Sequence, residues 1–239
     1  MFRGTCDGVE AAIKVFGAGI DTRRIDREID LLSELKCPYV VRLLRHFTGM
    51  LGTEPVRILA YELHGGGDLT RHLAPGAAPL SSSDLLRIGR HVAEAISTLW
   101  SKRIVHRDIK PANIVCAADG RYVLVDVGFA RHLDRSDITL AGAPGTVGFR
   151  SPEQARGRKS LTIHSDVFAL GVTLFTLACR SHPFGGRDPL LPQPADMTPL
   201  LSRSDLRCEF SKLVQEMLSF APASRPTDIA SRFAALGEP

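Results

Sequence analysis

An acid, a lysine and an amide stand close together in the segment 105–113, VHRDIKPAN, as Asp108, Lys110 and Asn113. Short apolar runs precede and follow this segment, which predicts a loop between two short strands. A second carboxylate, Asp126, comes 13 residues after Asn113 and directly behind an apolar run. Carboxylate and amide oxygens are hard ligands that suit magnesium. The spacing predicts a site at which one group is transferred beside a divalent cation.

A lysine and a glutamate upstream form a second candidate pair. Lys14 lies inside the apolar stretch Val9 to Phe16, although only six of the 30 basic residues are lysine. An uncompensated cation in such a strand would be costly, so Lys14 needs an anion. Glu28 falls on the apolar stripe of the next predicted helix, between Ile25 and Leu32. We expect Lys14 and Glu28 to satisfy each other.

The elements that must carry these residues divide the chain into a small mixed part and a mainly helical part. Apolar periodicity predicts a strand, a helix and two strands before residue 64, with the last two strands at 40–44 and 56–63. Gly and Pro clusters mark residues 64–80 as a connection. Ser81 and Asp84 resemble the cap of a helix that ends near Trp100. Short strands then give way to helices at 166–179, 210–218 and 227–236.

In this order and spacing, the residues resemble the eukaryotic-type protein kinase family, serine/threonine branch. The resemblance covers nearly the whole chain. It implies an α+β, two-lobed protein-kinase-like fold. A truncated N-terminal β-sheet lobe with one helix would span 1–63, the hinge and connection 64–80, and a mainly helical C-terminal lobe 81–239.

The same resemblance assigns roles in phosphoryl transfer. Asp108 matches the acid that receives the substrate hydroxyl proton, and Lys110 matches the lysine that marks serine/threonine kinases. Lys14 matches the ATP-binding lysine, and Glu28 matches its helix partner. Asn113 and Asp126 match the Mg²⁺ ligands, which makes ATP and Mg²⁺ the implied cofactors.

The connection and the second half of the chain also match family segments. Glu62, Leu63 and His64 would form the adenine hinge, with Tyr61 at the back of the pocket and Asp68 as a ribose contact. Residues 145–153 resemble the end of an activation segment in which Thr146 positions the substrate. The remaining matches are the start of the buried central helix at Ser165 and Asp166 and an Arg225 that pairs with Glu153. Arg107, beside Asp108, suggests control by phosphorylation of the activation segment, with Ser136 and Thr139 as the candidates.

The chain departs from the family pattern in three places. No G-x-G-x-x-G precedes Lys14, so the sequence is expected to start within the family's second strand and to cover bound ATP less completely. Val127 replaces the usual phenylalanine after Asp126, in a hydrophobic column that would also contain Leu32, Leu43 and His106. The proline-rich stretch 187–201 is expected to be irregular where the family has a helix.

Composition excludes several other classes of protein. A formal charge of +4 over 239 residues argues against a dedicated nucleic-acid binder. The longest uncharged stretch, 167–179, is 13 residues long, short of the roughly 20 that cross a bilayer. No secretory segment follows Met1, and the five cysteines are scattered, so an intracellular, cytoplasmic protein without disulfides is expected. A zinc site is also disfavoured, because no H-x₃₋₅-H pair occurs.

The expected function is transfer of the γ-phosphoryl group of Mg-ATP to serine or threonine hydroxyls of a protein. The alternative is a pseudokinase or scaffold that keeps the fold with weak or no turnover, as the missing glycine-rich loop and Val127 would allow. A small-molecule phosphotransferase is a third interpretation. Lys110 and Ser151-Pro152-Glu153 argue against it. Neither the protein substrate nor the oligomeric state is indicated.

Overall fold

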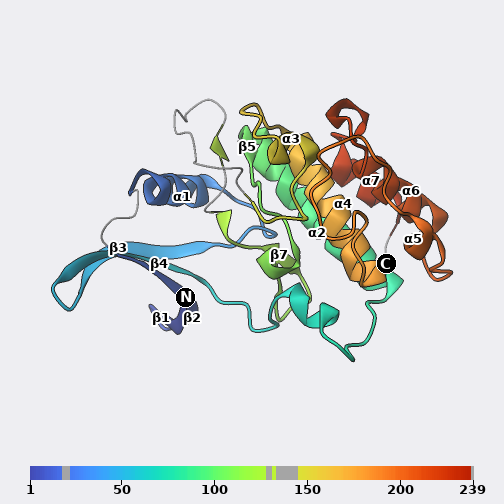
Figure 1. Cartoon of the computed structure of the whole chain (residues 1–239). Helices are drawn as coiled ribbons and strands as arrows, with labels where there is room; N and C mark the ends of the chain where they lie inside the picture. Colours follow the sequence, from blue (N-terminus) through green and yellow to red (C-terminus); the bar gives the residue numbers. More distant parts are fainter. Residues whose placement is uncertain (18–21, 128–130, 133–144, 238–239) are drawn as a thin grey trace.

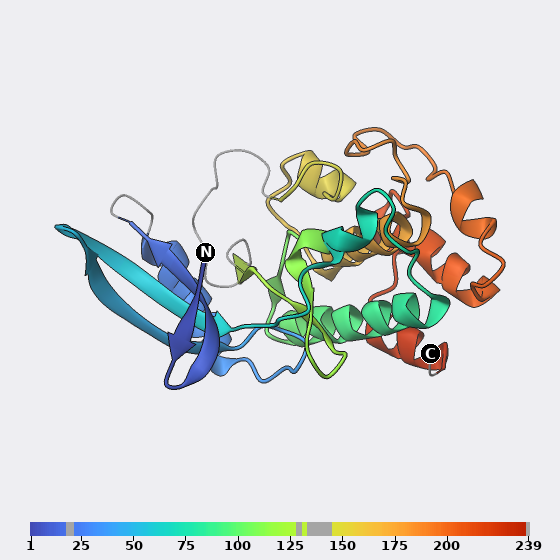
Figure 2. The ribbon, with the colours of Figure 1, turned by 90° about the horizontal axis from the view of Figure 1, so that it is seen from below.

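The computed structural model describes residues 1–17, 22–127, 131–132 and 145–237, and its N-terminal and C-terminal parts differ in secondary structure. A sheet with one helix forms the N-terminal lobe, and helices dominate the C-terminal lobe (Figure 1). Seen from below, the twisted sheet lies beside the helical part rather than across it (Figure 2). The α+β, two-lobed fold predicted from the sequence is confirmed.

The N-terminal sheet has four antiparallel strands in the order β1-β2-β4-β3. Their bounds are Phe2–Cys6, Val9–Phe16, Glu54–Glu62 and Leu43–Leu51, in that order. Asp7 and Gly8 join β1 to β2 with φ angles of 51° and 80°, the left-handed conformation that a two-residue hairpin turn requires. In the register of β2 and β4, Lys14 pairs with Leu59 and Ala12 pairs with Tyr61.

Helix α1 (Thr22–Glu34) packs beside the sheet and buries the predicted stripe of Ile25, Ile29 and Leu32. The strand predicted at 40–44 begins later than predicted, and only residues 43 and 44 of that range belong to it. Val40 instead forms an isolated parallel bridge with Leu124 of the other lobe, and β3 begins only at Leu43. The apolar run is divided because its first part completes a sheet edge in the C-terminal lobe.

The C-terminal lobe is built around two long helices, α2 (Ser82–Ser101) and α4 (Ile163–Cys179). The predicted cap of α2 is confirmed, because the Ser81 hydroxyl accepts a hydrogen bond from the Asp84 backbone N–H at 3.1 Å. Fourteen of the 17 residues of α4 are buried, which makes it the central helix of the lobe. The shorter helices are α3 (Pro152–Ala155), α5 (Thr198–Leu201), α6 (Cys208–Met217) and α7 (Ile229–Ala235).

Short strands and 3₁₀ turns lie between α2 and the sheet lobe. β5 (Ile104–Val105) pairs with β8 (Arg131–His132), and β6 (Ile114–Cys116) pairs with β7 (Tyr122–Leu124). Two 3₁₀ turns here are η1 (Leu69–Leu73) and η2 (Pro111–Asn113), while a third in the described residues, η4 (Pro222–Ser224), lies between α6 and α7. Loops connecting these small elements carry most of the polar residues singled out in the sequence.

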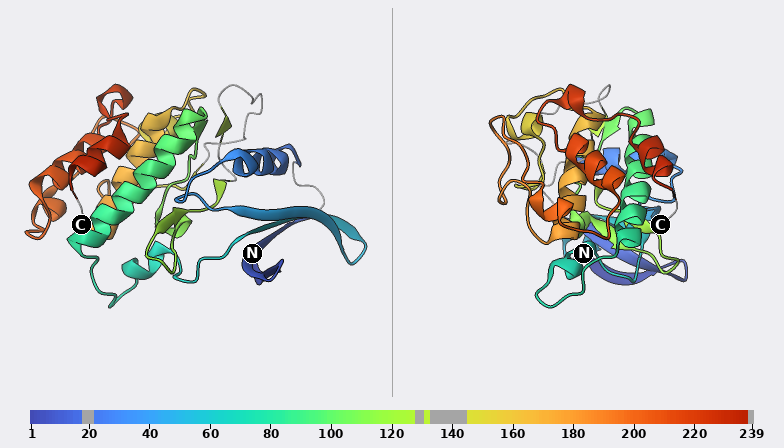
Figure 3. Two further views of the ribbon diagram at one scale, coloured as in Figure 1. Left: turned by 180° about the vertical axis from the view of Figure 1, so that it is seen from behind. Right: turned by 90° about the vertical axis from the view of Figure 1, so that its right-hand side faces the viewer.

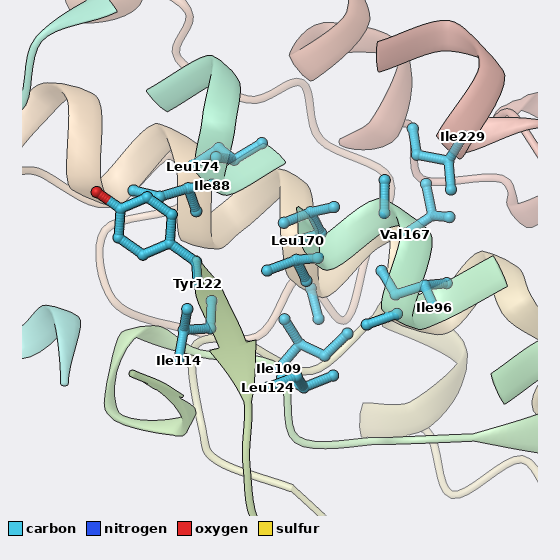
Figure 4. Close-up of a cluster of buried hydrophobic side chains, with 14 of the residues drawn as sticks. Ile88, Ile96, Ile109, Ile114, Tyr122, Leu124, Val167, Leu170, Leu174 and Ile229 are labelled. Atoms are coloured by element: carbon cyan, nitrogen blue, oxygen red, sulfur yellow. The ribbon is translucent and has the colours of Figure 1, made fainter. Parts of the chain in front are cut away.

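Apolar side chains from α2, α4 and β7 meet in the core of the C-terminal lobe (Figure 4). Helix α7 lies along α2 on its outer side (Figure 3, left). Their close approach depends on Gly89, because a Cβ atom added there would stand 2.3 Å from the Phe233 ring.

The segment 187–201 is mostly irregular, as its prolines predict, although its last four residues form α5. No helix within the described residues is long and apolar enough to cross a membrane.

Candidate active site

Lys14, Glu28 and Asp126 meet where the two lobes face each other. Lys14 Nζ lies 3.0 Å from Asp126 Oδ1 and 3.8 Å from Glu28 Oε1. The Glu28 side chain is only 2% exposed, whereas those of Lys14 and Asp126 are 22% and 32% exposed, so an incoming molecule can reach the ammonium group and Asp126 but not Glu28. Three distant segments of the sequence, β2, α1 and the end of β7, therefore meet as predicted.

The phenol of Tyr61 also belongs to this cluster. Tyr61 Oη donates a hydrogen bond to Glu28 Oε1 at 2.5 Å, and the whole tyrosine is 5% exposed. Burial and the neighbouring Glu28 carboxylate raise the pKa of Tyr61 well above its usual range, which keeps the phenol protonated and able to donate. The sequence placed Tyr61 at the back of a pocket but did not reveal this bond.

The loop after β5 presents Asp108, which is 3% exposed. Its Oδ2 lies 2.9 Å from Lys110 Nζ and accepts a hydrogen bond from Asn113 Nδ2 at 3.0 Å. Asn113 Nδ2 also donates to the Asp108 backbone carbonyl at 2.8 Å. The acid, the lysine and the amide predicted from the spacing therefore form one hydrogen-bonded group.

Thr146 closes this group from the opposite side. Its backbone N–H and its hydroxyl donate to Asp108 Oδ1 at 2.9 and 2.8 Å. Lys110 Nζ donates to the same hydroxyl oxygen. An aliphatic hydroxyl is thus held between a carboxylate and an ammonium group, and the chain itself supplies the hydroxyl.

A buried carboxylate supports the loop from the centre of the C-terminal lobe. Asp166, near the start of α4, accepts hydrogen bonds from the backbone N–H groups of His106 and Arg107 at 2.7 and 2.9 Å. Its burial raises the pKa of the Asp166 carboxyl, while the charge of His106 and the two backbone donors oppose that shift. Arg107 has a φ of 73°, a conformation that costs a non-glycine residue about 1 kcal/mol or more. The Asp166 hydrogen bonds offset this strain.

A second buried ion pair lies beneath the end of the activation-segment match. Arg225 Nη1 and Nη2 donate to the two carboxylate oxygens of Glu153 at 2.8 and 3.1 Å. Ser165 Oγ donates to Glu153 Oε1 at 2.7 Å. The pairing of Arg225 with Glu153 expected from the resemblance is present.

A cavity of about 130 Å³ opens beside Lys14. Its walls are mainly apolar, and the charged and polar groups that line it are Lys14, Glu28 and Asp126, the Tyr61 phenol, and the hinge residues Glu62 and His64. The lining residues are Met1, Ala12, Lys14, Glu28, Val41, Tyr61, Glu62, Leu63, His64, Val115, Val125 and Asp126. A flat apolar ring system that carries an anionic chain would match this distribution.

All three residues predicted at the hinge, Glu62, Leu63 and His64, line that cavity. Glu62 Oε2 also lies 3.4 Å from Arg42 Nε. Burial lowers the pKa of His64, so its ring is neutral near pH 7. Asp68 lies outside the lining and accepts a hydrogen bond from the Thr70 backbone N–H at 2.9 Å. Its ribose contact stays a prediction.

Other expectations are partly outside the described residues. Val127 is 2% exposed, and Leu32 and His106 are also buried, while Leu43 packs against the same core. The hydrophobic column itself stays a prediction. Ser136 and Thr139, the phosphorylation candidates, lie outside the described residues. Within the described part of the chain, no cluster of three or more His, Cys, Asp and Glu side chains could hold a metal ion.

Comparison with known proteins identifies the family. A family model described as the protein kinase domain matches residues 6–235. The "Probable serine/threonine-protein kinase PknB" of Lactococcus lactis is 30% identical over 181 residues, which cover 73% of this chain and 28% of that protein. RqkA of Deinococcus radiodurans, a DNA damage-responsive serine/threonine-protein kinase, is 34% identical over 191 residues, or 75% of this chain and 27% of the relative.

A eukaryotic relative, the calcium/calmodulin-dependent protein kinase cmkA of Emericella nidulans, is 26% identical over 245 residues, or 93% of this chain and 55% of the relative. The chain spans less than a third of the length of the two bacterial relatives. Because the kinase model matches nearly its whole length, the chain belongs to the eukaryotic-type protein kinase family, and its relatives place it with the serine/threonine kinases.

Proposed function

We propose that the chain transfers the γ-phosphoryl group of Mg-ATP to serine or threonine hydroxyls of a protein. The observation that carries this proposal is the pair formed by Asp108 and Lys110, which grips the aliphatic hydroxyl of Thr146. A substrate hydroxyl has the same chemistry. The carboxylate can orient it and accept its proton, and the ammonium group can stabilise negative charge on the phosphate.

The charged groups that line the cavity suit a nucleoside triphosphate. Lys14 presents a partly exposed cation next to a mainly apolar cavity that matches an adenine ring in character. Glu28 offsets the cost of placing that cation in the sheet. Because Asp126 Oδ1 lies 3.0 Å from Lys14 Nζ, the ammonium group and a cation held by the Asp126 carboxylate would reach the same phosphate chain.

The oxygen donors also fit Mg²⁺. Asn113 turns its amide nitrogen toward Asp108, so its carbonyl oxygen is left at the opposite end of the amide. The Val125 backbone N–H donates to the backbone carbonyl of Asn113 at 2.9 Å, which brings the neighbouring Asp126 close to Asn113. Asn113 and Asp126 would supply the protein oxygens, and a bound Mg²⁺ would neutralise charge on the phosphate oxygens.

The chain's own residues then divide the work between alignment and charge. Asp166 and Asn113 fix the position of Asp108, so the attacking hydroxyl meets a carboxylate that is already oriented. Each Asp108 oxygen already has two partners: Oδ1 accepts two hydrogen bonds from Thr146, and Oδ2 contacts Asn113 and Lys110. A substrate hydroxyl must therefore share or displace the contacts that Thr146 makes with Asp108.

Incubation of the chain with labelled ATP, Mg²⁺ or Mn²⁺ and casein tests the proposal. We expect incorporation of label into serine and threonine, and we expect Asp108→Asn to reduce it by about 10²- to 10⁴-fold, the usual contribution of a general base. Nucleotide affinity should change less than about twofold, because Asp108 does not line the cavity. Asp119→Asn, at an exposed turn, is the matched control. Incorporation that survives Asp108→Asn unchanged would contradict the proposal.

The pseudokinase or scaffold interpretation is favoured by Val127, which carries less bulk than the phenylalanine usual after this aspartate. It predicts nucleotide binding without incorporation of label under any of these conditions. A small-molecule phosphotransferase would instead phosphorylate an aminoglycoside or choline faster than any protein, and the same labelled ATP measures both.

A further inference from the structure

Tyr61 and Lys14 reach the same carboxylate from neighbouring strands. In the β2–β4 register Lys14 pairs with Leu59 and Ala12 pairs with Tyr61. Side chains two apart on a strand share a face, so Lys14 and Tyr61 project from the same face of the sheet as diagonal neighbours. Glu28 approaches that face from α1. Two donors of different charge are therefore aimed at one acid.

The distances show which donor holds Glu28. Tyr61 Oη is 2.5 Å from Glu28 Oε1, whereas Lys14 Nζ is 3.8 Å from the same oxygen. Lys14 lies closer to Asp126, at 3.0 Å. The neutral phenol makes the short hydrogen bond to the buried carboxylate, and the ammonium group makes its short contact with the more exposed acid.

A buried carboxylate needs a hydrogen-bond donor, since an unpaired charge there is strongly destabilising. If Lys14 were the only donor, it would be drawn toward Glu28 and away from Asp126. The phenol removes that requirement because it satisfies Glu28 without using the lysine's charge.

We propose that Tyr61 is a positioning residue: its phenol holds the Glu28 carboxylate in place and so leaves the Lys14 ammonium group beside Asp126, ready for phosphate. This inference rests on the proposed function. It gives the Tyr61 hydroxyl a role of its own, because any large side chain could fill the back of the cavity but only one with a donor could hydrogen-bond to Glu28.

The test is a double-mutant cycle with Tyr61→Phe and Glu28→Met. Tyr61→Phe removes only the hydroxyl, and Glu28→Met removes both carboxylate oxygens at similar length. Tyr122→Phe is the matched control, because the Tyr122 hydroxyl lies 3.4 Å from Asp84, outside the cavity lining. For each protein we would measure kcat and KM for ATP, the affinity for Mg-ATP by calorimetric titration, and the urea midpoint.

We expect Tyr61→Phe to lower kcat/KM for ATP by about tenfold. A hydrogen bond to a charged group contributes enough for about a ten- to hundredfold effect, and Lys14 is near enough to replace part of it. Tyr122→Phe should change kcat/KM less than about twofold. In the Glu28→Met background, adding Tyr61→Phe should also have less than about a twofold effect, because its acceptor is gone.

Equal effects of Tyr61→Phe in the two backgrounds would overturn the inference, as would unchanged kinetics in the Tyr61→Phe single variant. A chain that binds Mg-ATP without turnover refutes the proposed function. In that case the same double-mutant cycle, measured as affinity for Mg-ATP, tests the role of Tyr61. If the chain binds no nucleotide, the urea midpoints decide. A midpoint lowered by Tyr61→Phe only when Glu28 is present supports the inference, and equal shifts in both backgrounds overturn it.

Discussion

Arg225 is completely enclosed, with a side-chain exposure of 0%, and all five of its N–H donors have acceptors. Nε donates to the Ser219 carbonyl at 2.7 Å. Nη1 donates to Glu153 and to the His164 carbonyl, and Nη2 donates to Glu153 and to the Phe220 carbonyl, at 2.8 to 3.1 Å. Replacing Arg225 by methionine keeps most of the volume and removes every one of these bonds.

The expected loss for Arg225→Met is about 3–5 kcal/mol of unfolding free energy, the usual effect of stranding one member of a buried ion pair. Glu153 would keep only Ser165 as a side-chain partner among the hydrogen bonds described for it. Arg232→Met is the control: the Arg232–Glu216 pair is 2.7 Å long but 40% and 45% exposed, so its loss should be below about 1 kcal/mol.

Urea unfolding at pH 7, followed by circular dichroism and by the fluorescence of Trp100, measures these losses. The double variant Arg225→Met, Glu153→Met should be more stable than Arg225→Met alone, because it buries no unpaired charge. The reasoning fails if Arg225→Met lies within about 1 kcal/mol of the wild type or if the double variant is the less stable protein.

The same pair predicts a dependence on pH. Burial raises the pKa of Glu153, but the hydrogen bonds and charge of Arg225 and the hydrogen bond from Ser165 lower it by more. The pKa of Glu153 therefore lies below its ordinary value of 4.5. A lowered carboxyl pKa adds stability that is present above the unfolded pKa and disappears as the pH falls through the folded pKa. The difference in stability between wild type and Arg225→Met should therefore narrow below about pH 4.5.

Two further predictions concern α2. Burial, with nearby arginines, lowers the pKa of His91 to about 4, and its Nδ1 accepts the Tyr122 N–H at 3.0 Å; stability should fall as the pH drops from about 6.5 toward 4, and less so in His91→Gln. Equal slopes in urea titrations would contradict this. Gly89→Ala should destabilise by about 1–3 kcal/mol through contact with Phe233, despite better helix propensity. Adding Phe233→Leu should recover part of that loss, and an unchanged urea midpoint in Gly89→Ala would refute it.

Much of the site could be predicted because its residues carry local signals. Lys14 interrupts an apolar strand, and Glu28 interrupts an apolar helical stripe, so each shows in the sequence as a polar residue on a buried face. Asp108, Lys110 and Asn113 lie within six residues of one another, and one loop suffices to bring them together. The confirmed cap at Ser81 is likewise a local pattern.

What could not be predicted depends on pairing between distant segments. The hydrogen bond from Tyr61 to Glu28 depends both on the register of β2 with β4 and on the packing of α1 against the sheet. The residues around Tyr61 determine neither of these. The run at 40–44 is predicted as one strand because four of its five residues are Val or Leu. Its division between two lobes is decided by Leu124, more than 80 residues away. The enclosure of Arg225 by three carbonyls is a product of loop geometry.

The bridge at Leu124 links two acids of the site. The Leu124 N–H donates to the Tyr39 carbonyl and its own carbonyl accepts the Val41 N–H, both at 2.9 Å. The connector that follows the helix bearing Glu28 is therefore tied to the strand that ends just before Asp126, while Lys14 belongs to the sheet. A rotation of the sheet against the C-terminal lobe would draw the Lys14 ammonium group away from Asp126, while Glu28 stays with the sheet through its hydrogen bond with Tyr61.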